Sequence, residues 1–196
     1  LDGIITAEGS VGIDKDKQGI HKITISFDYT NNEEILIFKS VLDLLKMKYK
    51  TSRGKYIISR WENNYTFIKT FVLENFQPFR LAPNKSRLLI NGFLNHQRTK
   101  SILKYLKQIN LKDNKTIRDI TQELSCHESS VREAFIGKFN RFGFWTISGK
   151  GINNDPFKFR ITDQGKIFLK VIDTLKEWLI EVEKEYYYDQ NLISKI

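Results

Sequence analysis

Near its N-terminus the chain alternates apolar and polar residues, and this alternation predicts an antiparallel hairpin. Ile23, Ile25 and Phe27 occupy every second position, with polar residues between them. A period of two is typical of a β-strand that buries one face. Residues 10–15 and 21–30 are therefore predicted as two strands that share one apolar face and one hydrogen-bonding face.

After residue 31 the apolar residues recur with the spacing of a helix, and further along the chain they recur with the spacing of a strand again. Residues 32–47 combine an acidic first turn with helically spaced apolar positions, which predicts an amphipathic helix. A second hairpin is predicted for residues 48–53 and 55–61. The patterns of residues 63–76 and 84–95 predict two more helices.

The first residues are mostly apolar or small and end in a glutamate followed by a glycine. Gly3 and Ala7 are four positions apart and would share one face of a helix. Two small residues there allow a second, identical helix to approach closely, so Gly3 and Ala7 are predicted to form a dimer interface. Glu8 falls at the end of this helix, immediately before Gly9.

The segment Leu1–Gly9 resembles, position for position, the LAGLIDADG motif of the homing endonucleases. Asp2 stands for the first alanine of the motif, Thr6 for its first aspartate and Glu8 for its final, metal-binding aspartate. The predicted order of elements is similar to the αββαββα order of one LAGLIDADG unit. The resemblance implies an α+β fold in which antiparallel sheets from two units lie in the DNA major groove.

A second stretch carries the same resemblance. Phe71 to Leu89, which contains Gln77-Pro78-Phe79, is similar to the corresponding part of single-motif endonucleases. We find no second LAGLIDADG motif, whereas such an enzyme needs two units. The chain is therefore expected to form a homodimer on a near-palindromic site, or to act with an upstream LAGLIDADG unit, since it begins inside its own motif.

The resemblance also implies a set of catalytic groups. Glu8 and its symmetry mate would ligate Mg²⁺ together with the scissile phosphates, and the backbone carbonyl of Ala7 would be a second ligand. Asn31 stands close to a polar active-site position of the family, at the end of the second strand. In the family a lysine follows the Gln-Pro-Phe stretch, but here Ala82 or Pro83 holds that position.

Two basic residues flank that position and could replace the missing lysine. Lys85 is taken as the candidate catalytic residue and Arg80 as a DNA contact, although both could equally be ordinary phosphate contacts or solvated charges. The hydrogen-bonding faces of the two hairpins are predicted to contact DNA bases, because a twisted ribbon fits the major groove. The residues concerned are Asp14, Asp16, Gln18, Lys22, Thr24, Ser26, Asp28, Thr51, Arg53 and Lys55.

The second half of the chain predicts a different fold. Three helices are expected at residues 99–113, 116–124 and 129–141, with Thr116 as an N-cap and Asp119 at the capping-box position. Strands are expected at 144–147 and 157–161 around a glycine-bearing loop, and then a final helix that opens at Thr162–Lys166. This is the order of a winged helix, and Phe159–Lys166 resembles the join after the wing in bacterial and archaeal winged-helix regulators.

The winged-helix reading predicts a second DNA-binding surface. Arg132 and Lys138 would lie on the recognition helix, and Lys150 and Lys158 on or beside the wing. An alternative is an accessory domain that packs against the first one or mediates dimer contacts. The amphipathic segment Val171–Tyr188 could be a dimerisation arm or a helix packed on its own domain.

Composition agrees with a nucleic-acid partner. The chain has 32 Lys and Arg against 23 Asp and Glu, a net charge of +9, and both halves are basic. A single cysteine excludes an intrachain disulfide and a cysteine zinc site, and the three histidines lack metal-ligand spacing. No stretch is long and apolar enough for a membrane span, and no signal peptide is evident, so an intracellular location is expected.

Three functions fit these observations. We predict an endonuclease domain at residues 1–96 and a winged-helix-like domain at 97–196, which together form a site-specific, Mg²⁺-dependent double-strand DNA endonuclease. The retained Glu8 favours this function. A DNA-binding regulator without catalytic activity is the first alternative, favoured by the missing lysine and the regulator-like second domain. An intron-RNA splicing cofactor on the same fold is the second.

Overall fold

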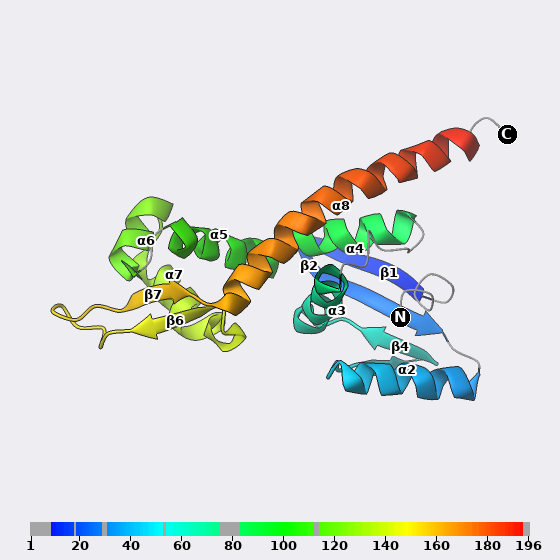
Figure 1. Ribbon diagram of the computed structural model, residues 1–196, viewed down its shortest axis with the longest axis horizontal. Coiled ribbons are helices and arrows are strands. Elements are labelled where there is room, and N and C mark those ends of the chain that lie inside the picture. The colour runs from blue at the N-terminus through cyan, green and yellow to red at the C-terminus, as the bar shows by residue number, and fades with distance from the viewer. Residues whose placement is uncertain are drawn as a thin grey trace. The chain divides into compact units, whose positions relative to one another are not determined.

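The computed structural model describes residues 9–17, 19–28, 31–52, 54–74, 83–111 and 114–193. The chain divides into two compact units, one formed by Leu1–Thr99 with Val171–Ile196 and the other by Lys100–Lys170. The sequence predicted a boundary between residues 96 and 97, with the whole last helix in the second domain. In the structure most of that helix, from Val171 onward, belongs to the first unit. Helices and two antiparallel sheets make up the units, and the α+β fold class is confirmed (Figure 1).

The sheet of the first unit is built from the two predicted hairpins. Its strands are β1 (Gly9–Asp16), β2 (Gly19–Asp28), β3 (Lys50–Ser52) and β4 (Lys55–Ile58), in the order β1-β2-β4-β3 with antiparallel pairing throughout. Both hairpins are thereby confirmed, although the predicted strand 55–61 ends at Ile58 and Trp61 already begins a helix. The register shifts once, between Asp14 and Lys15, which is a β-bulge that the alternation did not predict.

Three helices cover one face of this sheet: α2 (Asn32–Leu44), α3 (Trp61–Leu73) and α4 (Pro83–Asn95). Ile23, Ile25 and Phe27 of β2 point into the space between sheet and helices and are fully buried.

Ring contacts and one close backbone approach show how these helices pack. Phe38 of α2 lies 4.4 Å from the Phe27 ring, centroid to centroid. On α4, a Cβ added to Gly92 would lie 3.1 Å from Cδ1 of Ile13, so the absence of a side chain there allows α4 to approach the sheet. The Trp61 ring of α3 stacks on the Phe93 ring of α4.

The second unit has the winged-helix order of elements. After α5 (Gln97–Leu111), which begins in the first unit, come α6 (Ile117–Leu124) and α7 (Glu128–Arg132), and then β6 (Trp145–Ser148) and β7 (Lys158–Ile161). The predicted capping box at the start of α6 is confirmed, because the Thr116 and Asp119 side chains each bond the other's backbone N–H. A two-residue strand, β5 (Lys115–Thr116), adds to β7 and was not predicted.

The predicted helix 129–141 is not one regular helix. After α7 the backbone widens into a π-helix over Glu133–Lys138, and a 3₁₀ turn follows at Asn140–Phe142. Ala134, Phe135 and Phe139 are all buried, and the Phe139 N–H reaches back five residues to the Ala134 carbonyl at 3.1 Å. The wider turn places these buried positions on a narrower face of the helix than regular α-helical spacing would.

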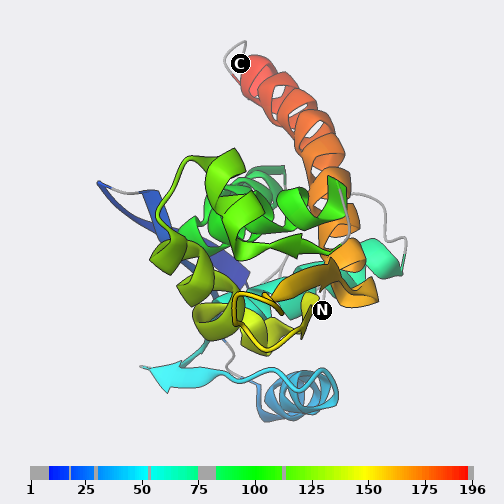
Figure 2. The same cartoon turned by 90° about the vertical axis from the view of Figure 1, so that its left-hand side faces the viewer.

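The final helix is longer than predicted. α8 runs without a break from Asp163 to Ile193, visible in both views of the molecule (Figures 1 and 2), and joins the segments predicted at 162–166 and 171–188. Gly165 lies in its first turn, where a Cβ would come within 2.2 Å of the Phe144 carbonyl oxygen. None of the described helices combines the length and apolar composition that a membrane span requires.

His96, at the junction of α4 and α5, is a buried titratable side chain of the first unit. Its side chain is 7% exposed, and its Nδ1 accepts a hydrogen bond from the Arg98 N–H at 3.0 Å. Burial, and then the Arg98 charge, lower the pKa of His96 below its ordinary 6.5, although a backbone hydrogen bond at His21 acts in the opposite direction. The unfolded chain therefore binds a proton more readily than the folded chain.

We expect the free energy of unfolding to be constant above about pH 7 and to fall as the pH drops through the ordinary histidine pKa of about 6.5. Urea unfolding between pH 7.5 and 5 measures this, and His96→Gln should flatten the change over that window. His127→Gln, at an exposed position, is the control and should keep it. An unchanged pH profile in His96→Gln would show that other groups cause the loss.

Candidate nucleic-acid interface

The face of the first sheet opposite the helices carries hydrogen-bonding side chains. Because β2 buries Ile23, Ile25 and Phe27, the intervening Thr24 and Ser26 point to the other face. Ser26 is opposite Ser10 of β1, and their hydroxyls form a 2.7 Å hydrogen bond. The predicted positions Lys22, Thr24, Ser26 and Asp28 thus share an open face.

Two cross-strand ion pairs lie on the same face. Lys22 Nζ is 3.2 Å from an Asp14 carboxylate oxygen, and Lys55 Nζ is 3.2 Å from an Asp28 carboxylate oxygen. All four side chains are about half exposed, between 46% and 58%. Exposed pairs contribute only about 0–1 kcal/mol to stability, so each lysine can exchange its carboxylate for another acceptor at small cost.

One predicted contact lies on the wrong face. Thr51 is paired with Tyr56, whose ring is buried with the helices, and residues directly opposite each other share a face. Lys50 and Ser52 instead share the open face with Lys55, and neither was among the predicted DNA contacts. In a hairpin with a two-residue loop, the residues on either side of the loop lie opposite each other. Taking positions 53–54 as such a loop would have placed Ser52 opposite Lys55.

The remaining predicted groups of the first unit fall into two classes. The structure describes three of them, Asn31, Lys85 and Asp16. The others lie outside the described residues: Gly3, Ala7, Glu8, Gln18, Arg53 and Arg80. Asn31 is the N-cap of α2, and its Oδ1 accepts a 2.9 Å hydrogen bond from the Glu33 N–H. Asp16 accepts a 3.2 Å hydrogen bond from Gln97 Nε2, and Lys85 is half-buried in the first turn of α4.

The described residues do not bring the predicted catalytic groups together as a metal site. Within the part of the chain that the structure covers, no three His, Cys, Asp or Glu side chains are grouped so that they could hold a metal ion. The two predicted metal ligands, Glu8 and Ala7, are not in that part. Mg²⁺ binding, and the catalytic roles of Asn31 and Lys85, therefore stay predictions.

In the second unit the predicted basic residues are all exposed. Arg132 is held by Glu128 at 3.3 Å, one helical turn before it, and also lies over the Phe157 ring at 5.8 Å. Lys138 is exposed at the end of the π-helix, and Lys150 and Lys158 are exposed on the wing and on β7.

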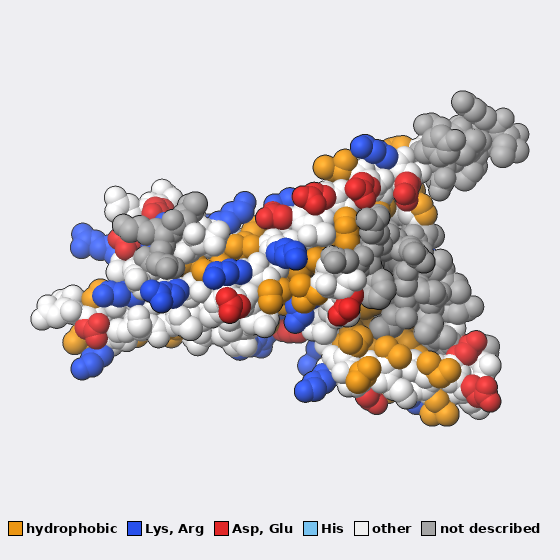
Figure 3. All heavy atoms as spheres, viewed as in Figure 1, with side chains coloured by type: hydrophobic (Ala, Val, Ile, Leu, Met, Phe, Trp, Pro, Cys, Tyr) orange, Lys and Arg blue, Asp and Glu red, His pale blue; other side chains and the backbone are white. Residues whose placement is uncertain are grey.

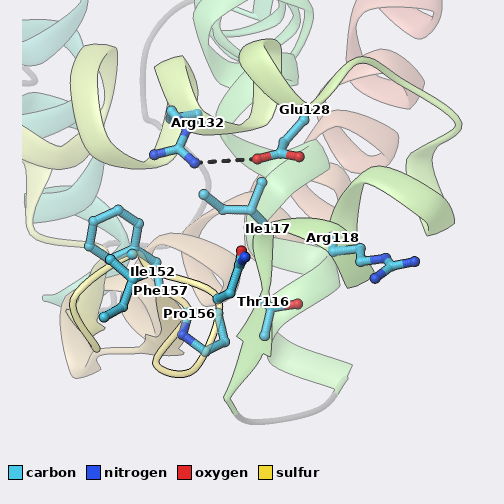
Figure 4. Close-up of a pocket in the computed structure, with 10 residues that line it drawn as sticks. Thr116, Ile117, Arg118, Glu128, Arg132, Ile152, Pro156 and Phe157 are labelled. Carbon is cyan, nitrogen blue, oxygen red and sulfur yellow. Dashed lines mark hydrogen bonds and ion pairs between the residues drawn. The ribbon is translucent and has the colours of Figure 1, made fainter.

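A cleft lies between the helices α6 and α7 and the wing, the loop that joins β6 and β7 (Figure 4). It has a volume of about 500 Å³ and is lined by residues 116–118 at the start of α6, by Glu128 and Arg132 of α7, and by residues 151–153, 156 and 157. Arg118 and Arg132 supply its positive charges and Glu128 its carboxylate. Arg118 was not among the predicted contacts, since its position in the helix pattern gives no sign that it borders the wing.

The positive charge of the protein is concentrated in the second unit. Lys100–Lys170 contains 14 Lys and Arg against 7 Asp and Glu, whereas the rest of the chain contains 18 against 16. A net +7 of the total +9 therefore belongs to the second unit. Figure 3 shows Lys and Arg side chains spread over that unit. The first unit offers hydrogen-bonding groups on its sheet but little net charge.

Comparison with known proteins gives one structural neighbour. No protein-family model and no curated protein matches the chain. The archaeal intron-encoded homing endonuclease I-Vdi141I, solved in complex with DNA, is 16% identical and aligns over 89% of this chain and 93% of its own, with a TM-score of 0.34.

Proposed function

We propose that this protein is a site-specific, Mg²⁺-dependent double-stranded DNA endonuclease of the homing type, acting as a homodimer or together with an upstream unit. The observation that carries the proposal is the open face of the first sheet. Its alternate positions present lysine, threonine, serine and aspartate side chains away from the helices.

Such a face suits the DNA major groove, which is wide enough for a two-stranded ribbon and presents a distinct pattern of donors and acceptors for each base pair. Lys22 and Lys55 can donate to guanine, Asp14 and Asp28 can accept from the cytosine amino group, and Thr24 can do either. The lysines and aspartates of this face are now paired with each other, and each could exchange its partner for a DNA base.

The proposed chemistry rests on the motif at the N-terminus. A carboxylate from Glu8 and the carbonyl of Ala7 are oxygen donors, which Mg²⁺ prefers. When bound, the metal would supply an activated water and charge stabilisation at the scissile phosphate. Glu8 would hold the ion, and the small residues Gly3 and Ala7 would allow the symmetry mate to bring a second carboxylate beside it.

The test is cleavage of a randomised duplex library by the chain in Mg²⁺, in Ca²⁺ and in EDTA, with the products sequenced. Discrete double-strand cuts at a near-palindromic sequence, seen only in Mg²⁺, are the expected result. Selective binding without cutting in Mg²⁺ would overturn the endonuclease and support a DNA-binding regulator. The concentration of charge in the second unit favours that second candidate, because a winged helix alone can hold a duplex.

Lys55 gives a direct test of the sheet as a DNA surface. We expect Lys55→Ala to weaken DNA binding and, if Lys55 contacts a phosphate, to lower the slope of log K against log salt by about 0.9. If it reads guanine, affinity for one base position should fall by about 1–3 kcal/mol instead.

Lys176→Ala is the matched control. Lys176 lies in the same unit, is 49% exposed and is likewise paired with a carboxylate, at 2.6 Å from Asp173. Lys176→Ala should leave DNA binding unchanged. The free energy of unfolding of both variants should be within about 0.5 kcal/mol of wild type, because each loses only an exposed ion pair. Equal effects of the two substitutions on binding would count against the sheet as the interface.

A further inference from the structure

The wing of the second unit has an exposed apolar tip. We propose that this wing enters the DNA minor groove, where Ile152 acts as a wedge between base steps and Asn153 and Asn154 contact the base edges. The inference rests on the proposed function in one respect, that the protein binds duplex DNA. It adds a second groove, two residues that contact base edges and a deformation of the DNA.

The tip is a closed and ordered loop. The backbone carbonyl of Asp155 accepts hydrogen bonds from three successive N–H groups, those of Lys150, Gly151 and Ile152, at 3.1, 2.9 and 3.3 Å. The Asp155 side chain accepts another from the Lys150 N–H at 3.1 Å, and the Asp155 N–H donates to the Ile152 carbonyl at 3.0 Å. A loop bonded in this way holds its tip in one shape before any partner binds.

Two glycines make this shape possible. Gly149 and Gly151 have φ angles of +87° and +75°, a region that other residues rarely adopt. A Cβ at Gly149 would lie 2.3 Å from the Pro156 carbonyl oxygen, and one at Gly151 would lie 2.4 Å from the Phe157 ring. The wing is therefore tightly folded on itself, and Phe157 and Pro156 support the side of the loop that carries Ile152.

Ile152 is solvent-exposed although it is apolar. It is 59% exposed, and the second unit has no other exposed large hydrophobic side chain among its described residues. Asn153 and Asn154 follow it and are exposed as well. Minor-groove proteins combine asparagine, which reads base edges there, with apolar side chains that unstack a base step.

The cleft beside the wing contains two guanidinium groups. Ile152 lines it together with Arg118 and Arg132, so a wing in the minor groove would place the adjoining sugar–phosphate strand next to two guanidinium groups. Glu128 lies in the same cleft, 3.3 Å from Arg132. Both partners of that pair are about half exposed, so a phosphate can replace the carboxylate at small cost.

A wedge of this kind makes two measurable differences to the DNA. It kinks the duplex, and it disfavours guanine at the inserted step, since the guanine 2-amino group projects into the minor groove. The wing should therefore prefer A·T-rich or flexible pyrimidine–purine steps beside the sequence that the sheet reads.

The experiment uses the full chain and the duplex site recovered from the library. Anisotropy measures affinity, and energy transfer between dyes at the two ends measures bending. Ile152→Ala is expected to lose most of the bend and about tenfold in affinity, whereas Ile152→Leu should retain both. Ile180→Ala, 57% exposed on α8, is the control and should behave as wild type.

Inosine in place of guanine in the flanking steps removes only the minor-groove amino group. It should raise the affinity of wild type and not that of Ile152→Ala. Wild-type affinity and bend in Ile152→Ala, or an inosine effect equal in both proteins, would overturn the wedge while leaving the endonuclease proposal intact. Failure of the wild-type chain to bind any duplex would instead overturn the proposed function and this inference with it.

Discussion

Replacing Glu8 with glutamine is expected to lower the cleavage rate by about a thousandfold or more while DNA affinity stays near that of wild type. Glutamine keeps the size of glutamate and one acceptor oxygen, but it replaces the other oxygen with an NH₂ donor and loses the charge that would hold the metal. A bound divalent ion contributes several kcal/mol of transition-state stabilisation, and each 1.36 kcal/mol corresponds to about tenfold in rate. Single-turnover cleavage of the selected site in Mg²⁺ measures the effect.

Two controls separate loss of metal from loss of fold. Glu8→Asp restores the carboxylate found in the family motif and should recover most of the activity. Lys176→Ala removes an exposed lysine of the same unit, and this variant should cleave normally. Wild-type cleavage by Glu8→Gln would remove Glu8 from the proposed chemistry, and loss of DNA binding in the same variant would indicate damage to the fold.

Replacing Phe135 with alanine is expected to destabilise the second unit by about 3–5 kcal/mol, the usual cost of deleting a fully buried aromatic ring. Phe135 is fully buried, and its ring lies 4.7 Å from that of Trp145 and 4.3 Å from that of Phe159. The Trp145 indole N–H also donates a 2.9 Å hydrogen bond to the Phe135 carbonyl. Deletion leaves a cavity where the π-helix meets both strands of the wing.

Hydrogen exchange resolved by peptide is the appropriate measurement, because a chain with two units need not unfold in one step. Protection should fall across residues 115–161 and change much less in the first sheet. Phe142→Ala, at a position that is only half-buried, should cost less. An equal loss of protection in both units would show that they unfold together. A loss below about 1 kcal/mol would contradict the packing described for Phe135.

The elements that the sequence predicted correctly are those with local causes. Alternation of Ile23, Ile25 and Phe27 was enough for β2 and for the face of its polar neighbours. The capping box at Thr116 and Asp119 depends on residues three apart, so it too could be recognised in the sequence. The open face of the sheet, which carries the proposed function, follows from these local patterns.

The features that were missed depend on partners distant in sequence. Two residues, Lys115 and Thr116, form a strand only because β7 is beside them. Thr51 was placed on the wrong face because pairing with Tyr56, rather than its own neighbours, decides its side. The cleft between Arg118 and the wing brings together segments more than thirty residues apart, which no periodicity reports.

The unequal charge of the two units would have a kinetic consequence for an endonuclease of the proposed kind, which would have to find one site in a genome. Attraction to phosphates is independent of sequence and permits sliding along the duplex. With a net +7 in Lys100–Lys170 and +2 in the remainder, that unit would dominate residence on non-cognate DNA. The nearly neutral sheet could then sample successive base pairs without being trapped at each one. Search and recognition would thus be assigned to different halves of one short chain.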